Sequence, residues 1–197
     1  MAARPRRTVR AKALRLACWN ADGVRSRKLE LEHFLSQHGI DICLLSETFL
    51  NSGQTFRLAN YVCHRTDRPT AGGGTAILVR HGITHHSVPV PDHTQLEATA
   101  IQVMQADRPM KVLAAYLSPS RPLIGSDLDA CFGGCLPVLM AGDLNAKLVD
   151  WNSRLSTRRV NSCVTMPMGT PVLSLGRTPQ PLNHKTPLLL PMSWTSW

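Results

Sequence analysis

The sequence lacks the features that would direct it to a membrane, a zinc ion or an oxidising compartment. It has no run of about 18 apolar residues, which excludes a membrane-spanning helix, and no apolar run of a secretory signal near its start. Its six cysteines form neither a C-x-x-C pair nor a zinc-type spacing with histidine. We therefore expect an intracellular protein, nuclear or cytoplasmic rather than secreted, with reduced cysteines, no membrane partner and no zinc.

Acidic residues are scarce: 13 Asp and Glu face 22 Lys and Arg, giving a net charge of +9. This imbalance is compatible with an anionic partner such as nucleic acid. Six cations and no acid occupy the first 15 residues, namely Arg4, Arg6, Arg7, Arg10, Lys12 and Arg15. Residues 1–13 are interpreted as a solvated, disordered leader, with a nucleic-acid-binding arm or nuclear signal as the alternative.

Residues 160–197 contain no acid at all, and Arg177 and Lys185 are their only permanent cations. They hold six of the 14 prolines, a density that excludes regular helices and central strands. No period of 2 or 3.6 residues is visible there. The organised chain is therefore expected to end near Arg159, with 160–197 as a disordered tail.

Between these ends, apolar runs alternate with turn residues, as expected for one globular domain. The runs predict strands at 14–19, 42–45, 61–64, 75–80, 97–104, 111–115 and 136–141. The pattern over 28–37 predicts an amphipathic helix with four inward side chains, Leu29, Leu31, Phe34 and Leu35. Strands outnumber helices, which favours mixed sheets in an α/β or α+β layered fold.

Three connections carry smaller predictions. Residues 72–74 are three glycines without a following Lys-Ser or Lys-Thr, so they predict a turn before a strand and not a phosphate-binding loop. Asp127 and Asp129 are expected to start a surface helix. The histidines of the polar connection after residue 80 are interpreted as solvated loop residues; they are His81, His85 and His86.

Polar side chains follow four of the predicted strands directly. They are Asn20 and Asp22, Glu47, Tyr116, and Asp143 and Asn145. Each alone has a structural explanation as an Asx turn, a helix cap or a solvated loop residue. Four groups together, each after an apolar run, favour a site, because polar groups at neighbouring strand ends can converge on one crevice. Carboxylate oxygens suit Mg²⁺ completed by water and a substrate phosphate.

These positions also carry a family resemblance. The motifs Trp19-Asn20-x-Asp22-Gly23, Ser46-Glu47-Thr48, Ala115-Tyr116 and Gly142-Asp143-Leu144-Asn145 resemble, in this order, the exonuclease–endonuclease–phosphatase superfamily. Within it, the chain is most similar to the endonuclease domain of non-LTR, jockey-like or LINE-type, retrotransposon polyproteins. The most similar stretches are 72–79, 115–122 and 142–159, and the resemblance covers about residues 14–159.

The resemblance implies a metal-dependent phosphodiesterase that nicks DNA, folded as a layered sandwich of two mixed β-sheets flanked by helices. It implies that Glu47 binds Mg²⁺ or Mn²⁺, with Asn20 and Asp22 beside it. A divalent ion of this kind neutralises charge that develops on phosphoryl oxygens.

The resemblance also assigns the catalytic roles. It implies that Asp143 positions or deprotonates the attacking water, that Asn145 orients the site and that Tyr116 contacts the scissile phosphate. Arg121 and Ser120, close behind Tyr116 in the sequence, are candidate contacts to phosphate or DNA.

The chain departs from the family pattern beyond these motifs. The family ends its domain with a Leu-Asp strand motif and a Ser-Asp-His motif whose histidine is catalytic, and neither is present. Leu148 stands where relatives commonly have histidine. We therefore expect a C-terminally incomplete endonuclease fragment of weak or no activity. The alternatives are a non-enzymatic nucleic-acid-binding remnant and a family phosphodiesterase for another substrate, such as abasic DNA or a small phosphoester.

Residues from Val160 onward are predicted to be the family's coding DNA read one base out of frame. In the shifted frame, the last base of each codon is read with the first two bases of the next. Three residues are then fixed, because the residue before each is Met or Trp, which has a single codon. Pro167 becomes Ala, Gly169 remains Gly and Thr195 becomes Asp. The degenerate positions permit Gly-Lys-Leu-Leu-Arg-Asp-Tyr-Ala-Asp-Gly-Asn-Ser from Val160 and Pro-Asp-Val-Leu-Asp-Ile-Val from Pro191, both typical of the family. Sequencing the coding DNA tests this prediction, and a shifted frame without these phrases contradicts it, leaving an unrelated natural C-terminus.

Overall fold

The computed structural model describes residues 13–69, 72–90, 95–105 and 108–145, together with the backbone of two short strands further along. Residues 1–12 and the remainder of 146–197 lie outside the described residues. The predictions made for the basic leader, for Leu148 and for most of the tail therefore fall outside them as well.

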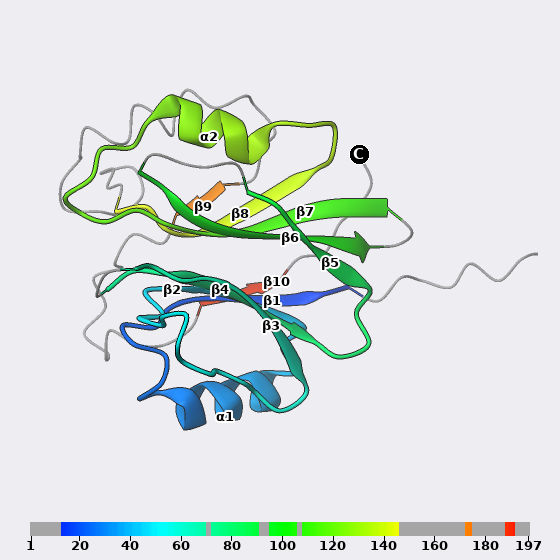
Figure 1. Ribbon diagram of the computed structural model, residues 1–197. Coiled ribbons are helices and arrows are strands. Elements are labelled where there is room, and N and C mark those ends of the chain that lie inside the picture. The colour runs from blue at the N-terminus through cyan, green and yellow to red at the C-terminus, as the bar shows by residue number, and fades with distance from the viewer. Residues whose placement is uncertain are drawn as a thin grey trace, which may run out of the picture.

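The chain forms two five-stranded mixed sheets that pack face to face, which confirms the predicted sandwich (Figure 1). The first sheet has the order β10-β1-β2-β4-β3, with strands Leu188–Pro191, Arg15–Asn20, Ile42–Ser46, Thr75–Arg80 and Tyr61–Thr66. The second has the order β5-β6-β7-β8-β9, with strands His85–Val88, Glu97–Gln105, Arg108–Tyr116, Val138–Asp143 and Val172–Ser174. Helix α1, Lys28–His38, covers the outer face of the first sheet, and α2, Gly125–Phe132, covers that of the second (Figure 1).

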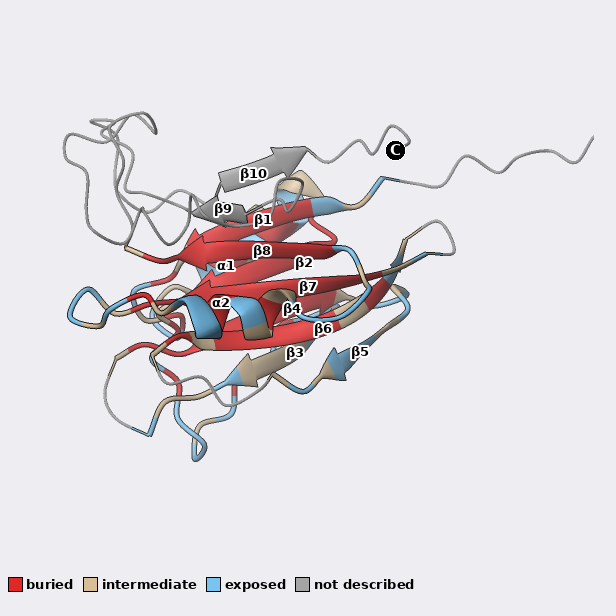
Figure 2. Ribbon diagram, turned by 90° about the horizontal axis from the view of Figure 1, so that it is seen from above, coloured by how far each residue is buried: buried red, intermediate tan, exposed pale blue. Residues whose placement is uncertain are grey.

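Strand β2 shows why the central strands read as continuous apolar runs. Ile42 and Leu44 point between the sheets, whereas Cys43 and Leu45 point toward the α1 layer, and all are fully buried. A strand covered on both faces needs apolar side chains at every position. Strands β1 and β2 are parallel and joined through α1, so both end at the same edge of their sheet. Figure 2 shows these buried central strands bordered on one side by β3 and β5, whose residues are intermediate or exposed.

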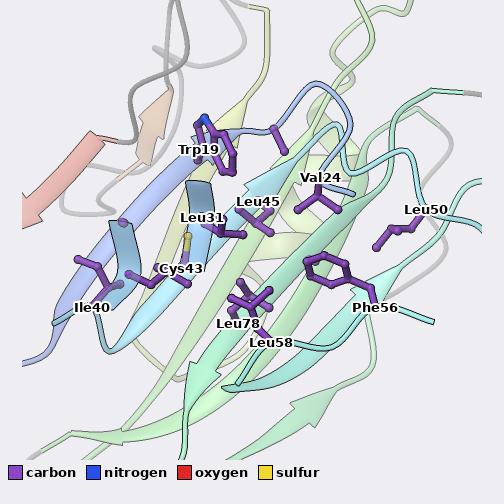
Figure 3. Close-up of a cluster of buried hydrophobic side chains, with 14 residues drawn as sticks. Trp19, Val24, Leu31, Ile40, Cys43, Leu45, Leu50, Phe56, Leu58 and Leu78 are labelled. Atoms are coloured by element: carbon purple, nitrogen blue, oxygen red, sulfur yellow. The ribbon is translucent and has the colours of Figure 1, made fainter. Parts of the chain in front are cut away.

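Helix α1 corrects one core prediction. Leu31 and Leu35 are buried and Phe34 is partly buried against the first sheet, as predicted, but Leu29 is 81% exposed. Residues two positions apart on a helix do not share a face, so Leu29 cannot point inward together with Leu31. Figure 3 shows Leu31 among the side chains of the sheet.

Strand β5 was not predicted, and it corrects the interpretation of His85 as a solvated loop residue. The Nε2 atoms of His85 and His64 lie 2.9 Å apart, and the Nδ1 atom of His85 lies 2.7 Å from the Ile83 carbonyl oxygen. Burial lowers the pKa of His64, and the neighbouring His85 lowers it further. The pair joins edge strand β3 of one sheet to edge strand β5 of the other.

Two further differences concern Asp127 and the tail. Asp127 stands in the first turn of α2 as predicted, but it is buried, because its carboxylate accepts hydrogen bonds from the backbone amides of Gln95 and Leu96. Beyond Arg159, where the organised chain was expected to end, β9 and β10 pair with β8 and β1. Both are edge strands, the position in a sheet where proline is tolerated.

The described part of the chain contains five free cysteine thiols, three of them buried, while Cys163 lies outside it. None of its helices has the length and apolar character needed to cross a membrane.

The exposure difference on α1 gives a matched pair of variants. Leu31→Ala removes a fully buried side chain, so it should lower the free energy of unfolding by about 2–5 kcal/mol. Leu29→Ala should change it by no more than about 0.5 kcal/mol, because Leu29 is largely in solvent. Urea denaturation followed by circular dichroism measures both, and equal losses would contradict the inward face described here.

Candidate functional site

The site lies where strand ends from both sheets meet, and one amide group connects them. The Asn20 side chain, at the end of β1, donates from Nδ2 to Glu47 Oε1 at 2.9 Å and to Asp143 Oδ2 at 3.0 Å. Glu47 directly follows β2 in the first sheet, whereas Asp143 ends β8 in the second. Three of the residues predicted from separate motifs are therefore in direct contact.

Tyr116 joins this group from the end of β7, where it pairs in register with Asp143. Its hydroxyl donates a hydrogen bond to the Glu47 carboxylate. Burial is the largest cause that raises the pKa of Tyr116 to about 12, and the negative charges of Glu47 and Asp143 add to it. The phenol therefore stays protonated and is a hydrogen-bond donor at neutral pH.

Asn145 fixes the other oxygen of Asp143. Its backbone amide donates to Asp143 Oδ1 at 2.9 Å, and its side-chain Nδ2 donates to the Leu117 carbonyl at 2.9 Å. The residue has a left-handed backbone with φ of 49°, a conformation that asparagine tolerates better than most residues. Both oxygens of Asp143 are thus oriented by neighbours.

The structure places the remaining predicted residues at the margin of this group. The Asp22 carboxylate, whose side chain is 62% exposed, pairs with Arg27 at 3.2 Å, and the Asp22 backbone amide donates to Asn20 Oδ1 at 3.2 Å. Ser120 is exposed, with its hydroxyl 3.1 Å from that of Ser118, and Arg121 follows it in the same loop after β7. Asp22 therefore supports Asn20 through its backbone, while its carboxylate is engaged with Arg27.

The loop that carries Glu47 is held by the glycine turn before β4. Glu47 has a left-handed φ of 53°, and the next amide, Thr48 N, donates to the Gly74 carbonyl at 3.3 Å. A Cβ atom on Gly74 would lie 2.6 Å from Thr48 Oγ1, so this approach requires glycine. The predicted turn at 72–74 is confirmed, with all three glycines at positive φ.

Glu97 is the site residue that sequence reasoning missed. Its Oε2 accepts a 2.6 Å hydrogen bond from the Gly74 amide, and its Oε1 lies 3.0 Å from Arg68 Nε. It starts β6 and pairs in register with Tyr116, so it lies at the same sheet edge. The predicted site residues all follow strands, whereas Glu97 begins one. In an antiparallel pair, the start of one strand lies beside the end of the other, and that rule identifies Glu97.

The donor set fits a hard divalent cation. Glu47 and Asp143 offer carboxylate oxygens, each of which can accept more hydrogen bonds or ligand contacts than the structure uses. Within the described residues, no group of three or more His, Cys, Asp or Glu side chains is placed to enclose an ion. Mg²⁺ is commonly held by only one or two carboxylates, with water and substrate phosphate completing its shell, so these residues suit Mg²⁺ or Mn²⁺.

Comparison with known proteins identifies the class. Residues 17–197 match the model of the Endonuclease/Exonuclease/phosphatase family, and the chain belongs to this family. The match continues past residue 159, where the sequence resemblance was expected to end; the division into domains stays a prediction.

The relatives are retrotransposon proteins. The RNA-directed DNA polymerase from mobile element jockey of Drosophila funebris is 30% identical over 149 residues, covering 74% of this chain and 16% of that protein. The probable RNA-directed DNA polymerase from transposon X-element of Drosophila melanogaster is 28% identical over 166 residues, covering 82% of this chain and 18% of that protein. This chain therefore spans less than a fifth of the length of these relatives.

Solved structures show the same fold. The endonuclease domain of TRAS1, a telomere-specific non-LTR retrotransposon, superposes with a TM-score of 0.64 at 17% identity, covering 78% of this chain and 70% of that one. The structure of D. rerio TDP2 complexed with a single-strand DNA product superposes with a TM-score of 0.56 at 18% identity, covering 80% of this chain and 67% of that one.

The two tyrosines of the chain permit a direct test of the site's electrostatics. In a Tyr61→Phe background, absorbance at 295 nm should show Tyr116 ionising at a pKa of about 12 in the folded chain. Its contribution to stability is complete below the ordinary pKa of 10.0 and is lost as pH rises from there toward 12. Adding Glu47→Gln should lower this pKa, because a negative charge is removed; an unchanged value would contradict the Tyr116–Glu47 contact.

Proposed function

We propose that this chain carries the site of a Mg²⁺-dependent endonuclease that nicks DNA, with weak activity. The observation that carries the proposal is the Asn20 amide that holds the Glu47 and Asp143 carboxylates together at the ends of strands from two sheets. Membership of the Endonuclease/Exonuclease/phosphatase family and the likeness to retrotransposon proteins support DNA as the substrate.

Each residue has a separate task in phosphodiester hydrolysis. Glu47 would hold the cation, which supplies charge neutralisation on the phosphoryl oxygens when bound. Asp143 accepts a proton from the attacking water, since Asn20 and Asn145 orient both of its oxygens and leave lone pairs available. Tyr116 keeps its proton and donates a hydrogen bond to a phosphate oxygen in exchange for its bond to Glu47.

The weak activity follows from the motif that the sequence lacks. A histidine in the family's Ser-Asp-His motif would add a further catalytic group, and the only histidine after residue 93 is His184, which is followed by lysine. General acid–base groups contribute about 10²–10⁴-fold to a rate, so hydrolysis without this one is expected to be slow but above background.

A plasmid assay tests the proposal. The purified chain with Mg²⁺ should convert supercoiled plasmid slowly to the nicked form, and EDTA should stop the conversion. Glu47→Ala and Asp143→Asn should each reduce the nicking rate to the level of the buffer. Circular dichroism must show that both variants are folded like the parent chain.

The same assay separates the two other candidate functions. Folded parent protein that nicks no faster than Glu47→Ala would overturn the endonuclease proposal and leave a DNA-binding role, which the net charge of +9 favours. DNA affinity that falls steeply with salt concentration would then support that role, because contacts to phosphate release counterions. Hydrolysis of an abasic oligonucleotide or a small phosphoester, with intact plasmid untouched, would instead support another substrate.

A further inference from the structure

We propose that the ring of Phe49 is a stacking platform for an unpaired nucleobase beside the phosphate that is bound at the Glu47 site. This inference rests on the proposed function and adds a contact that would favour locally unpaired DNA. Phe49 stands two residues after Glu47, in the loop that leaves β2.

Exposure first singles out Phe49. Four large hydrophobic side chains are exposed among the described residues: Leu29, Phe49, Val62 and Met104. Leu29 lies on α1, Val62 on edge strand β3 and Met104 near the far end of β6, away from the end that pairs with Tyr116. Phe49 is 40% exposed and is the one member of this set in a loop that carries a site residue.

Leu50, the residue after Phe49, anchors the same loop in the core. Leu50 is 3% exposed and belongs to the core beneath α1, where Figure 3 shows it with Phe56. The loop therefore buries Leu50 and turns Phe49 outward.

The backbone of Phe49 is fixed in an unfavourable conformation. Its φ is 53°, in the left-handed region that bulky residues rarely adopt, and its amide donates to the Gly73 carbonyl at 3.0 Å. Glycine would occupy this conformation without strain. An aromatic residue held there and exposed to water is a feature to be explained by function, since such strain concentrates at ligand-binding sites.

The ring lies close to the backbone of two glycines. A Cβ atom on Gly23 would lie 3.3 Å from the ring carbon Cδ2, and one on Gly72 would lie 3.9 Å from Cε1. The ring is thus supported by two glycine loops, one after β1 and one before β4. Arg25, which is exposed, belongs to the first of these loops and supplies positive charge for the DNA backbone.

Stacking chemistry specifies the ligand. A nucleobase offers a flat π-face to an aromatic ring irrespective of its identity. In an intact duplex both faces of a base are already covered by its neighbours, so a protein ring can stack only on a base that is unpaired or displaced. The contact should therefore favour a bulge or mismatch next to the bound phosphate over a fully paired duplex.

The experiment compares two duplexes with the full chain. One carries a single unpaired 2-aminopurine, the other is fully paired, and binding is measured by fluorescence anisotropy with Ca²⁺ in place of Mg²⁺ to limit cleavage. Phe49→Leu, which keeps an apolar side chain without a π-face, should weaken binding of the bulged duplex about tenfold. The same substitution should leave the affinity for the fully paired duplex unchanged. Phe49→Trp should bind the bulge at least as well as the parent.

The controls separate this inference from the proposed function. Met104→Ala removes an exposed apolar side chain remote from the site and should change neither affinity. A Phe49→Leu chain that binds the bulge within twofold of the parent, while Glu47-dependent plasmid nicking persists, would overturn the stacking role alone. A parent chain that binds neither duplex would overturn both.

A second readout needs no variant and so does not depend on how Phe49→Leu folds. Stacking quenches the fluorescence of 2-aminopurine, so the saturated complex with the parent chain should show reduced emission relative to the free bulged duplex. Undiminished emission at saturation would also overturn the proposal.

Discussion

The shared hydrogen bonds of the Asn20 amide are the interaction on which the site depends. Glu47 and Asp143 come from different sheets, and two carboxylates brought this close repel each other unless a donor lies between them. The Asn20 Nδ2 group has two hydrogens and gives one to each acid. The packing of the sheets and the geometry of the site are therefore coupled, because a shift of one sheet against the other would break one of these bonds.

The supports around this amide come from loops at the same edge. The Asp22 backbone holds the oxygen of Asn20, the glycine turn holds the loop of Glu47, and Glu97 holds that turn. Each link is a hydrogen bond that involves a backbone amide. The loops that carry the two acids are therefore held in place by neighbouring loops. Such preorganisation matters in hydrolysis, since groups already oriented need not reorganise when charge develops.

Sequence patterns predicted most of the central strands and the convergence of Asn20, Glu47, Tyr116 and Asp143, because buried parallel strands end at a common edge. They failed where a tertiary contact overrides the local pattern. Strand β5 has a polar sequence, and its order comes from pairing with β6 and from the His64 contact. Asp127 resembles a surface acid, yet two distant amides make its burial favourable. Glu97 was missed because its role depends on antiparallel register.

The two short strands of the tail have a consequence for how the sandwich is closed. Strand β10 covers the open edge of β1 and strand β9 that of β8, so one segment protects both sheets from edge-to-edge association with other chains. Pairing of this kind uses main-chain amides and carbonyls, which every residue except proline supplies in full. The cover on these edges therefore depends on backbone groups more than on particular side chains, whereas the site depends on particular side chains.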